Sequence, residues 1–352
     1  MPIFPLYALL FTDAGMSAGQ VSALFAIWSG VGILAEVPLG ALADRFSRRW
    51  SLVASGVCQA LGYALWTALP GFTAFAFGFV LWGLGGALTS GALEALLHDA
   101  LVDVGAEAHF GVLLGRVTAV ELLGQIPAAV LATALFSLGG FGVVGWVSVG
   151  VCLASSVVAA RLPETPRGEP ESYLGTLRSG LSDAASTPGL RMALVVAALL
   201  IGVDALEEYF PLLAQEWHVP TALVPVAVLI VPLAGAGGAA LGGTRWPVGV
   251  LLGVAAGFLA VAGVLRSPVG LVFVAVFYGL YRLVLVTVRT LVQERISGSA
   301  RATVTSVAEL FGETASFGVY LAWVLGGVVA VAAAVAVLAL VVGRAGVVAR
   351  AR

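Results

Sequence analysis

The sequence is poor in charge and contains no lysine, so all 17 of its basic residues are arginines. Only 10% of the residues are charged, whereas soluble domains carry roughly a quarter. By contrast, 60% are hydrophobic and the mean hydropathy is +1.06. A chain with so few charges cannot cover a water-facing surface. No basic stretch is interleaved with aromatic residues, so nucleic-acid binding has no support.

Cysteine and histidine are also scarce, which removes the usual means of building a metal or redox site. Cys58 and Cys152 each lie inside an apolar run, so they are expected to be small packing residues rather than a disulfide pair. The three histidines lack metal-ligand spacing. We expect no metal, no cofactor and no enzymatic activity.

What fills the chain instead is a series of long apolar runs. A bilayer core requires roughly 20 apolar residues per helix, and proline, glycine and charged interruptions delimit eleven such runs. They cover residues 21–43, 51–69, 73–97, 112–136, 141–160, 189–213, 221–243, 247–265, 268–291, 302–324 and 326–343. The sequence therefore predicts an all-α protein that crosses the membrane many times.

Two short motifs recur in the same order along the chain. AVELLGQ at 119–125 resembles VAELFGE at 307–313, and FPLYALL at 4–10 resembles FPLLAQE at 210–216. Paired halves of this kind are common in transporters. Phe210 lies about 20 residues into its apolar run, close to a full crossing. We therefore expect the natural start to lie upstream of Met1 and to complete a twelfth span; the alternative is a protein of eleven and a half helices.

The placement of arginine predicts the orientation in the membrane. If the loop at 44–50 is cytoplasmic and the spans alternate, thirteen arginines lie on the cytoplasmic side and only Arg266 lies outside. The polar stretch 161–188 and the C-terminus are then cytoplasmic. We expect one bundle over residues 1–160, a linker over 161–188 and a second bundle over 189–352. The excess of alanine, glycine and valine is typical of a GC-rich bacterial genome, which indicates a bacterial cell membrane.

With helices numbered as though the truncated first one were complete, the run 21–43 is the second helix. Its end carries a recognisable motif, Glu36-Val-Pro-Leu-Gly40-Ala-Leu-Ala-Asp44-Arg45-Phe-Ser-Arg48-Arg49. It resembles the signature loop of the major facilitator superfamily, in which a glycine is followed four positions later by aspartate-arginine and then by two basic residues. The resemblance implies two six-helix bundles related by a pseudo-two-fold axis, with transport by alternating access. Two departures weaken the analogy for proton coupling and export: helix 4 has no arginine in its outer part, and the second-half counterpart at 242–246 is degraded.

The same resemblance assigns a gate to this loop. Gly40 would let two helices approach closely, and Asp44 would rest against the positive N-terminal end of the eleventh helix. The basic residues of the loop would pair with carboxylates such as the one at the end of helix 4; the residues concerned are Arg45, Arg48, Arg49 and Asp99. The alternative is that the arginines only enforce topology.

Charged residues inside the predicted spans are the candidates for the transport site, since each costs at least about 2.5–3.5 kcal/mol at mid-depth. The deepest are Asp204, Arg282 and Glu313. Arg282 would compensate either carboxylate or bind an anionic group of a substrate; the alternative is a static buried ion pair. Glu121 and Glu309 occupy equivalent repeat positions and are shallower candidates, with inherited scaffold as the alternative.

These features together predict a secondary active transporter that moves a small solute between its two bundles. We expect coupling to protons, in the manner of an antiporter, and efflux of an amphipathic, drug-like compound. The expected partners are the solute, protons and the lipid bilayer, and we expect a monomer. The competing hypothesis is a transport-inactive membrane sensor or partner-binding protein, in which removing Asp204 or Arg282 leaves function unchanged. A channel fits less well, because a gating loop implies two closed ends.

Overall fold

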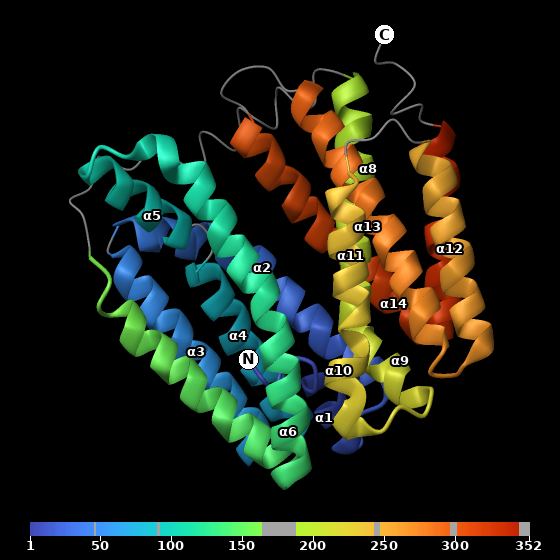
Figure 1. Ribbon diagram of the computed structural model, residues 1–352, viewed down its shortest axis with the longest axis horizontal. Coiled ribbons are helices and arrows are strands. Elements are labelled where there is room, and N and C mark those ends of the chain that lie inside the picture. The colour runs from blue at the N-terminus through green and yellow to red at the C-terminus, as the bar shows by residue number, and fades with distance from the viewer. Residues whose placement is uncertain (46, 90–91, 164–187, 243–246, 296–300, 345–352) are drawn as a thin grey trace. The chain divides into compact units, whose positions relative to one another are not determined.

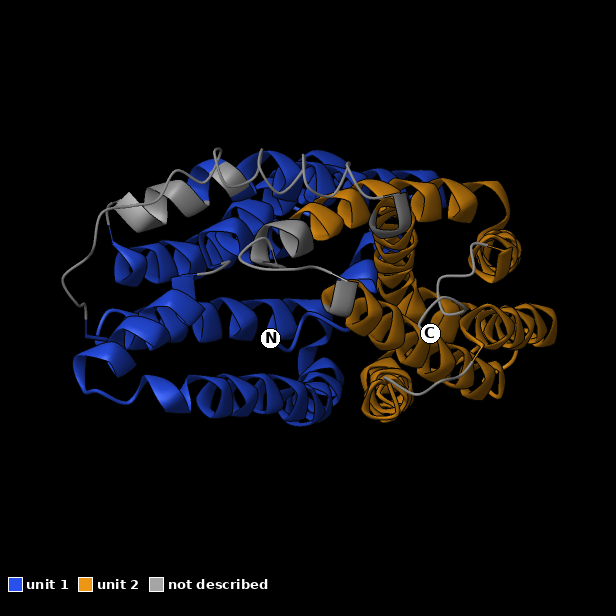
Figure 2. Cartoon of the chain, turned by 90° about the horizontal axis from the view of Figure 1, so that it is seen from above, with its two compact units in different colours: residues 1–171 blue, residues 172–352 orange. Residues whose placement is uncertain are grey.

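A computed structural model describes residues 1–45, 47–89, 92–163, 188–242, 247–295 and 301–344, and every regular element among them is a helix (Figure 1). The chain divides into two compact units, residues 1–171 and 172–352, which Figure 2 colours separately. Most of the expected linker, and the degraded loop after Gly242, lie outside the described residues.

The first unit consists of helices that mostly begin and end where the apolar runs do. They are α1 Tyr7–Asp13, α2 Ala18–Arg45, α3 Arg48–Ala68, α4 Phe72–Thr89, α5 Ala92–Asp103, the short 3₁₀ helix η1 Glu107–His109, and α6 Phe110–Ala159. Helix α4 packs against α2 and α3, and α3 also packs against α6.

Aromatic side chains make the core of the first unit. Phe11 and Phe75 lie with ring centroids 4.4 Å apart, and the buried ring of Trp66 meets Phe11 edge-on at 5.2 Å. The indole Nε1 of Trp66 donates to the Phe75 carbonyl oxygen at 3.0 Å, so the polar atom of this buried side chain is satisfied. This cluster fixes the short helix α1 against α3 and α4.

The second unit contains helices shorter and more often interrupted than their sequence pattern suggests. They are α8 Pro188–Val203, η2 Asp204–Tyr209, α9 Phe210–Glu216, η3 Thr221–Leu223, α10 Val224–Val228, α11 Ile230–Ala240, α12 Val248–Leu265, α13 Gly270–Arg295 and α14 Arg301–Arg344. Helix α13 packs against α8, α11 and α12, and α14 packs against α8 and α12.

Glycine permits a close helix contact in the second unit. A Cβ added at Gly238 in α11 would overlap the carbonyl oxygen of Gly279 in α13, whereas one added at the neighbouring Gly237 would meet nothing within 4 Å. The two backbones therefore approach more closely than any larger side chain would allow. Close backbone approach of this kind is how helices gain packing contacts where lipid supplies no hydrophobic driving force.

The two longest helices each contain a diglycine break, and the two breaks have nearly the same geometry. In α6, Gly140 has φ 61° and ψ −154°, and in α14, Gly327 has φ 60° and ψ −148°. This combination of φ and ψ is accessible essentially only to glycine. Each break follows the helix that carries one copy of the repeated motif at 119–125 or 307–313. The matched breaks show that the two halves share local structure as well as sequence.

Within the part of the chain that the structure describes, seven helical stretches are long and apolar enough to cross a membrane. They cover residues 18–36, 72–103, 107–159, 221–240, 248–265, 270–293 and 307–344. The stretches 107–159 and 307–344 each hold two of the predicted spans, joined at a diglycine break. The predicted spans 51–69 and 189–213 are helical but are not among the seven. A count of twelve spans stays a prediction.

Candidate functional site

Asp204 and Arg282 form an ion pair inside the second unit. Asp204 is the first residue after α8, and Arg282 lies in the middle of α13, which packs against α8. The Nη1 atom of Arg282 donates to Oδ1 and Oδ2 of Asp204 at 3.1 and 3.2 Å. The side chains are 30% and 32% exposed, respectively, so the pair is accessible and not sealed in the core. Of the two carboxylates that the sequence offered to Arg282, the structure pairs it with Asp204.

Two tyrosines of α13 hold this pair in place. The Tyr278 hydroxyl donates to Oδ1 of Asp204 at 3.3 Å and accepts from Nη1 of Arg282 at 3.4 Å. Tyr278 lies one helical turn before Arg282, so its ring also lies beneath the guanidinium group, 5.8 Å from the ring centroid. The buried Tyr281 donates to the Leu200 carbonyl oxygen at 2.7 Å and thereby ties α13 to the last turn of α8.

The helix that carries Asp204 changes geometry at this residue, which differs from the single span predicted over 189–213. Helix α8 ends at Val203 and the 3₁₀ helix η2 follows. Pro211 explains the change, because proline has no N–H to donate to the Glu207 carbonyl. That carbonyl accepts instead from the N–H of Phe210, three residues on. The resulting 3₁₀ turn brings three carboxylates into one short segment; mid-helix turns of this type often mark functional hinges.

The other carboxylates of this segment interact with the pair or with α14. Glu207 is exposed and lies close enough to interact electrostatically with Asp204 and Arg282. Glu208 lies close enough to Glu313 for their carboxylates to repel each other. Glu313 is exposed on α14. The sequence singled out Glu313 but did not place Glu207 or Glu208 at the site, although three acids within five residues were a visible signal.

A second ion pair links α13 to α14 in the same unit. Arg289 Nη2 donates to Glu309 Oε1 at 2.8 Å, and both side chains are well exposed, at 43% and 44%. This pairing was not predicted for Glu309. Glu121, at the equivalent repeat position, is exposed on α6 of the first unit. The two glutamates thus occupy equivalent sequence positions in separate units.

The signature loop lies where α2 gives way to α3 in the first unit. Ser47 caps α3 by accepting from the Trp50 N–H, which sets the direction of the arginines that follow. Arg48 Nη1 pairs with Oδ2 of Asp99 on α5. Arg49 Nη1 donates to the Leu162 carbonyl oxygen at 3.4 Å. Gly40, Asp44 and Arg45 belong to the backbone of α2, but the side chains of Asp44 and Arg45 and the surroundings of Gly40 lie outside what the structure describes.

Residues 15–19 match the spacing Gly-x-Ser-x-Gly of a nucleophile elbow, but the structure gives this serine a different role. Ser17 precedes α2, its N–H donates to Gln20 Oε1 at 3.0 Å, and its hydroxyl accepts from the Gln20 N–H at 3.3 Å. This reciprocal arrangement is a capping box. Among the described residues, no cluster of three or more His, Cys, Asp or Glu side chains suits a metal ion.

Comparison with known proteins supports this description of the fold. Two solved structures share it across nearly the whole chain. A mutant form of the nucleoside transporter NupG aligns with a TM-score of 0.73 and 15% identity, over 97% of this chain and 94% of that one. A second NupG structure aligns with a TM-score of 0.68 and 13% identity, over 99% and 95%.

Two relatives found by sequence have higher identity than the NupG structures but align over less of the chain. The uncharacterized MFS-type transporter Rv2456c of Mycobacterium tuberculosis strain H37Rv is 29% identical over 187 residues, which is 53% of this chain and 42% of the relative. Its counterpart in strain CDC 1551, MT2531, matches to the same extent. The match therefore spans less than half the length of these relatives.

These observations define a class of protein: a helical membrane protein with two units and an ion pair inside one of them. The family model described as Major Facilitator Superfamily matches residues 1–319. The chain belongs to this superfamily, a family of multi-pass membrane transporters and not of enzymes.

Proposed function

We propose that the protein is a secondary active transporter that moves a small solute by alternating access, with coupling to protons. The observation that carries the proposal is the Asp204–Arg282 pair bridged by Tyr278. Charged groups within a membrane-spanning bundle are costly and are retained where they handle a substrate or an ion. The accessibility of about a third of each side chain favours this role over a purely static pair.

The pair suggests how solute and proton would be coupled. With Asp204 ionised, its carboxylate occupies Nη1 of Arg282. A proton on a carboxylate oxygen of Asp204 removes the negative charge, weakens the ion pair and leaves the guanidinium group to bind an anionic or hydrogen-bonding group of the solute. Proton and solute binding would then depend on the same residue. Glu313 is a second candidate for the proton, because it lies beside Glu208.

The signature loop would form the gate of this transporter. We propose that Gly40, Asp44 and Arg45 act there together with the Arg48–Asp99 pair, which joins α3 to α5 within the first unit. Loss of such contacts would allow one end of the protein to open. Arg49 is already bound to the Leu162 carbonyl, so we assign it to anchoring the end of α6.

The remaining proposals concern setting and direction. We propose a monomer in a bacterial cell membrane, with the linker and the C-terminus in the cytoplasm, as the arginine distribution indicates. Efflux of an amphipathic, drug-like compound in exchange for protons is the direction we favour. We assign Glu309 to the scaffold, because it pairs with Arg289, and assign its repeat equivalent Glu121 likewise.

The test is proton movement in proteoliposomes that contain the purified protein and a pH-sensitive dye. The panel would contain amphipathic amines, sugars, organic acids and, because NupG is described as a nucleoside transporter, nucleosides. We expect one class to give a proton signal that Asp204→Asn abolishes. The matched control is Glu216→Gln, an exposed carboxylate of the same unit outside the pair.

Two results would contradict the proposal in different ways. Solute flux without a proton signal would remove the coupling but keep transport. No flux from any compound under an imposed gradient, or a signal unchanged in Asp204→Asn and Arg282→Met, would favour the transport-inactive sensor.

A further inference from the structure

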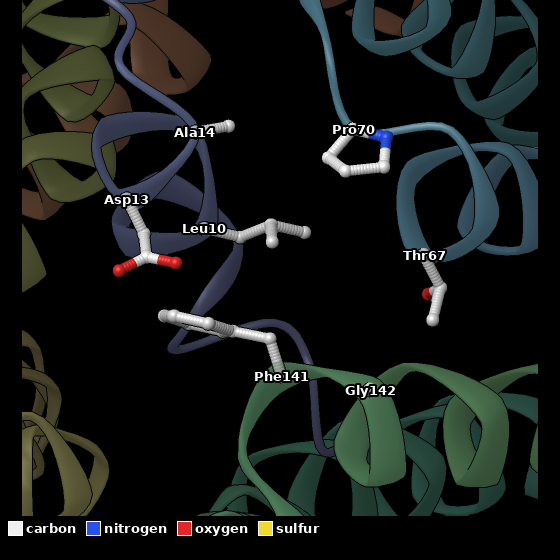
Figure 3. A pocket seen from close by; sticks show the side chains of 7 residues that line it. All are labelled: Leu10, Asp13, Ala14, Thr67, Pro70, Phe141 and Gly142. Atoms are coloured by element: carbon white, nitrogen blue, oxygen red, sulfur yellow. The ribbon is translucent and has the colours of Figure 1, made fainter.

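A pocket at one end of the first unit has no part in the proposed transport site. It has a volume of about 360 Å³. Figure 3 shows its walls: Asp13 and its neighbours at the end of α1, Thr67 and Pro70 where α3 leads into α4, and Phe141 just after the diglycine break of α6. All the lining residues belong to the first unit.

The polar side chains of this pocket offer hydrogen-bond acceptors. Asp13 supplies a carboxylate. Thr67 supplies a hydroxyl oxygen whose own proton is already donated to the Tyr63 carbonyl oxygen at 2.7 Å. Pro70 has no N–H to donate. A ligand complementary to these groups donates hydrogen bonds, and a positive charge on it would match the Asp13 carboxylate.

Asp13 has no partner within the part of the chain that the structure describes. Its carboxylate makes no hydrogen bond or ion pair there, although it is exposed beside the ring of Phe141 (Figure 3). It is also the last residue of α1, where the helix dipole disfavours a negative charge. A carboxylate and an aromatic face together form a recognised environment for an ammonium group.

The surroundings of the pocket are apolar and exposed. Leu69 precedes Pro70 and is 64% exposed, and Leu138, just before the diglycine break, is 80% exposed. Trp146, one turn beyond Gly142, is 54% exposed. Exposed leucines with a tryptophan near a helix end are typical of a membrane–water interface. A ligand with its charged head at Asp13 would lay an apolar body against Leu10, Pro70 and Phe141 of the lining.

We propose that this pocket binds the ammonium group of an amphipathic cation. The ammonium would donate to the Asp13 carboxylate and to Thr67 Oγ1, with the ring of Phe141 against its side. The same chemistry has two sources, the headgroup of phosphatidylethanolamine or a water-soluble organic amine. The inference is independent of the proposed transport, because the site lies at one end of the first unit and uses none of the residues of the Asp204–Arg282 pair.

Calorimetric titration of the purified protein in neutral maltoside micelles tests the site, with phenethylammonium as the probe and 2-phenylethanol as its uncharged counterpart. We expect saturable binding of the amine and not of the alcohol. Asp13→Asn should raise the Kd about tenfold or more, since a charge-assisted hydrogen bond is lost. Glu216→Gln, an exposed carboxylate elsewhere, should leave the Kd unchanged. Asp204→Asn should also leave it unchanged, which separates this site from the transport site.

The source of the ammonium group is decided by native mass spectrometry after exposure to phosphatidylethanolamine or phosphatidylglycerol. Retention of one phosphatidylethanolamine by the wild type but not by Asp13→Asn, together with displacement of phenethylammonium, assigns the lipid headgroup. Amine binding without retained phosphatidylethanolamine assigns a soluble cation. Equal amine affinity in wild type and Asp13→Asn, or equal binding of the alcohol, would overturn the proposal.

Discussion

A single nitrogen of Arg282, Nη1, contacts both carboxylate oxygens of Asp204 and the hydroxyl of Tyr278. All three contacts therefore depend on one rotamer of the arginine, and the removal of either charged partner costs the other its hydrogen-bonded counter-charge. Such loss is far more costly in a bundle core than at a water-exposed surface.

We predict that Asp204→Asn and Arg282→Met each lower the free energy of unfolding of the purified protein by about 1–3 kcal/mol. This range lies between the free energies measured for exposed ion pairs and for broken buried ones. The double variant should be more stable than either single variant, because neither member of the pair is left facing an uncharged replacement, yet it should still lack coupled flux. Thermal unfolding and the proteoliposome assay measure the two effects. Additive destabilisation in the double variant would show that the side chains do not interact.

The pairing illustrates what the sequence could and could not decide. Asp204, Arg282 and Glu313 could be identified as candidates from the sequence, because each is a charged residue within a long apolar run. The choice between Asp204 and Glu313 as the partner of Arg282 depends on how α8 packs on α13 and on where α14 lies in the unit, which the sequence does not encode locally. The contact between Tyr278 and Arg282 could have been predicted, since Tyr278 lies four residues before Arg282 and so on the same helix face.

A second prediction concerns the contact between α11 and α13. Gly238→Ala should lower stability by about 1–3 kcal/mol or more, since its Cβ would overlap the Gly279 carbonyl oxygen and force the helices apart. Gly237→Ala is the matched control, because it is adjacent and has open space around it. Thermal unfolding in one detergent compares them. Equal stability of the two variants would mean that α11 and α13 do not pack as closely as described.

The diglycine breaks give a third prediction. Gly140→Ala and Gly327→Ala should each lower the free energy of unfolding by about 1–3 kcal/mol, since both positions have backbone angles that other residues rarely adopt. The controls are Gly150→Ala and Gly318→Ala, which lie in the same helices with open space and ordinary angles. These two control variants should be at least as stable as the wild type, because alanine has a higher helix propensity than glycine. Controls as unstable as the test variants would show that backbone conformation is not the cause.

Regular features of this fold were more predictable than its interruptions. The eleven apolar runs coincide with helical segments, because hydrophobicity and length together dictate a membrane helix. The sequence also placed a boundary at residues 137–140, which includes Gly139-Gly140, and another at residue 325, just before Gly326-Gly327. The 3₁₀ turn at Asp204–Tyr209 was missed, although Pro211 was visible, because proline within an apolar run is compatible with a kinked but continuous helix. The Arg289–Glu309 pair was missed because it joins two helices across a loop.

A fourth prediction tests the contact at the signature loop. Asp99→Asn removes the charge that pairs with Arg48, whose side chain is only 19% exposed. Amide hydrogen exchange at the start of α3 should accelerate by up to about fivefold, the effect of losing about 0.2–1 kcal/mol from a partly exposed pair. Asp103→Asn, an exposed residue of the same helix α5, is the control and should change nothing. Faster exchange in both variants would point to a general loosening of α5.

The last prediction separates the two tyrosines of α13. Tyr278→Phe removes a hydrogen bond to the Asp204 carboxylate, and coupled flux should fall by about tenfold with little loss of stability. Tyr281→Phe removes a hydrogen bond to the Leu200 backbone, so it should lower the free energy of unfolding by about 0.5–1.5 kcal/mol. Because Tyr281 also lies close to the Asp204 carboxylate, flux per folded molecule should fall, but less than in Tyr278→Phe. Flux and thermal unfolding would be measured on the same preparations. The opposite result, with Tyr281→Phe impairing flux more and Tyr278→Phe impairing stability more, would mean that the connection between α8 and α13 governs the transport cycle and that the hydroxyl on the ion pair is only structural.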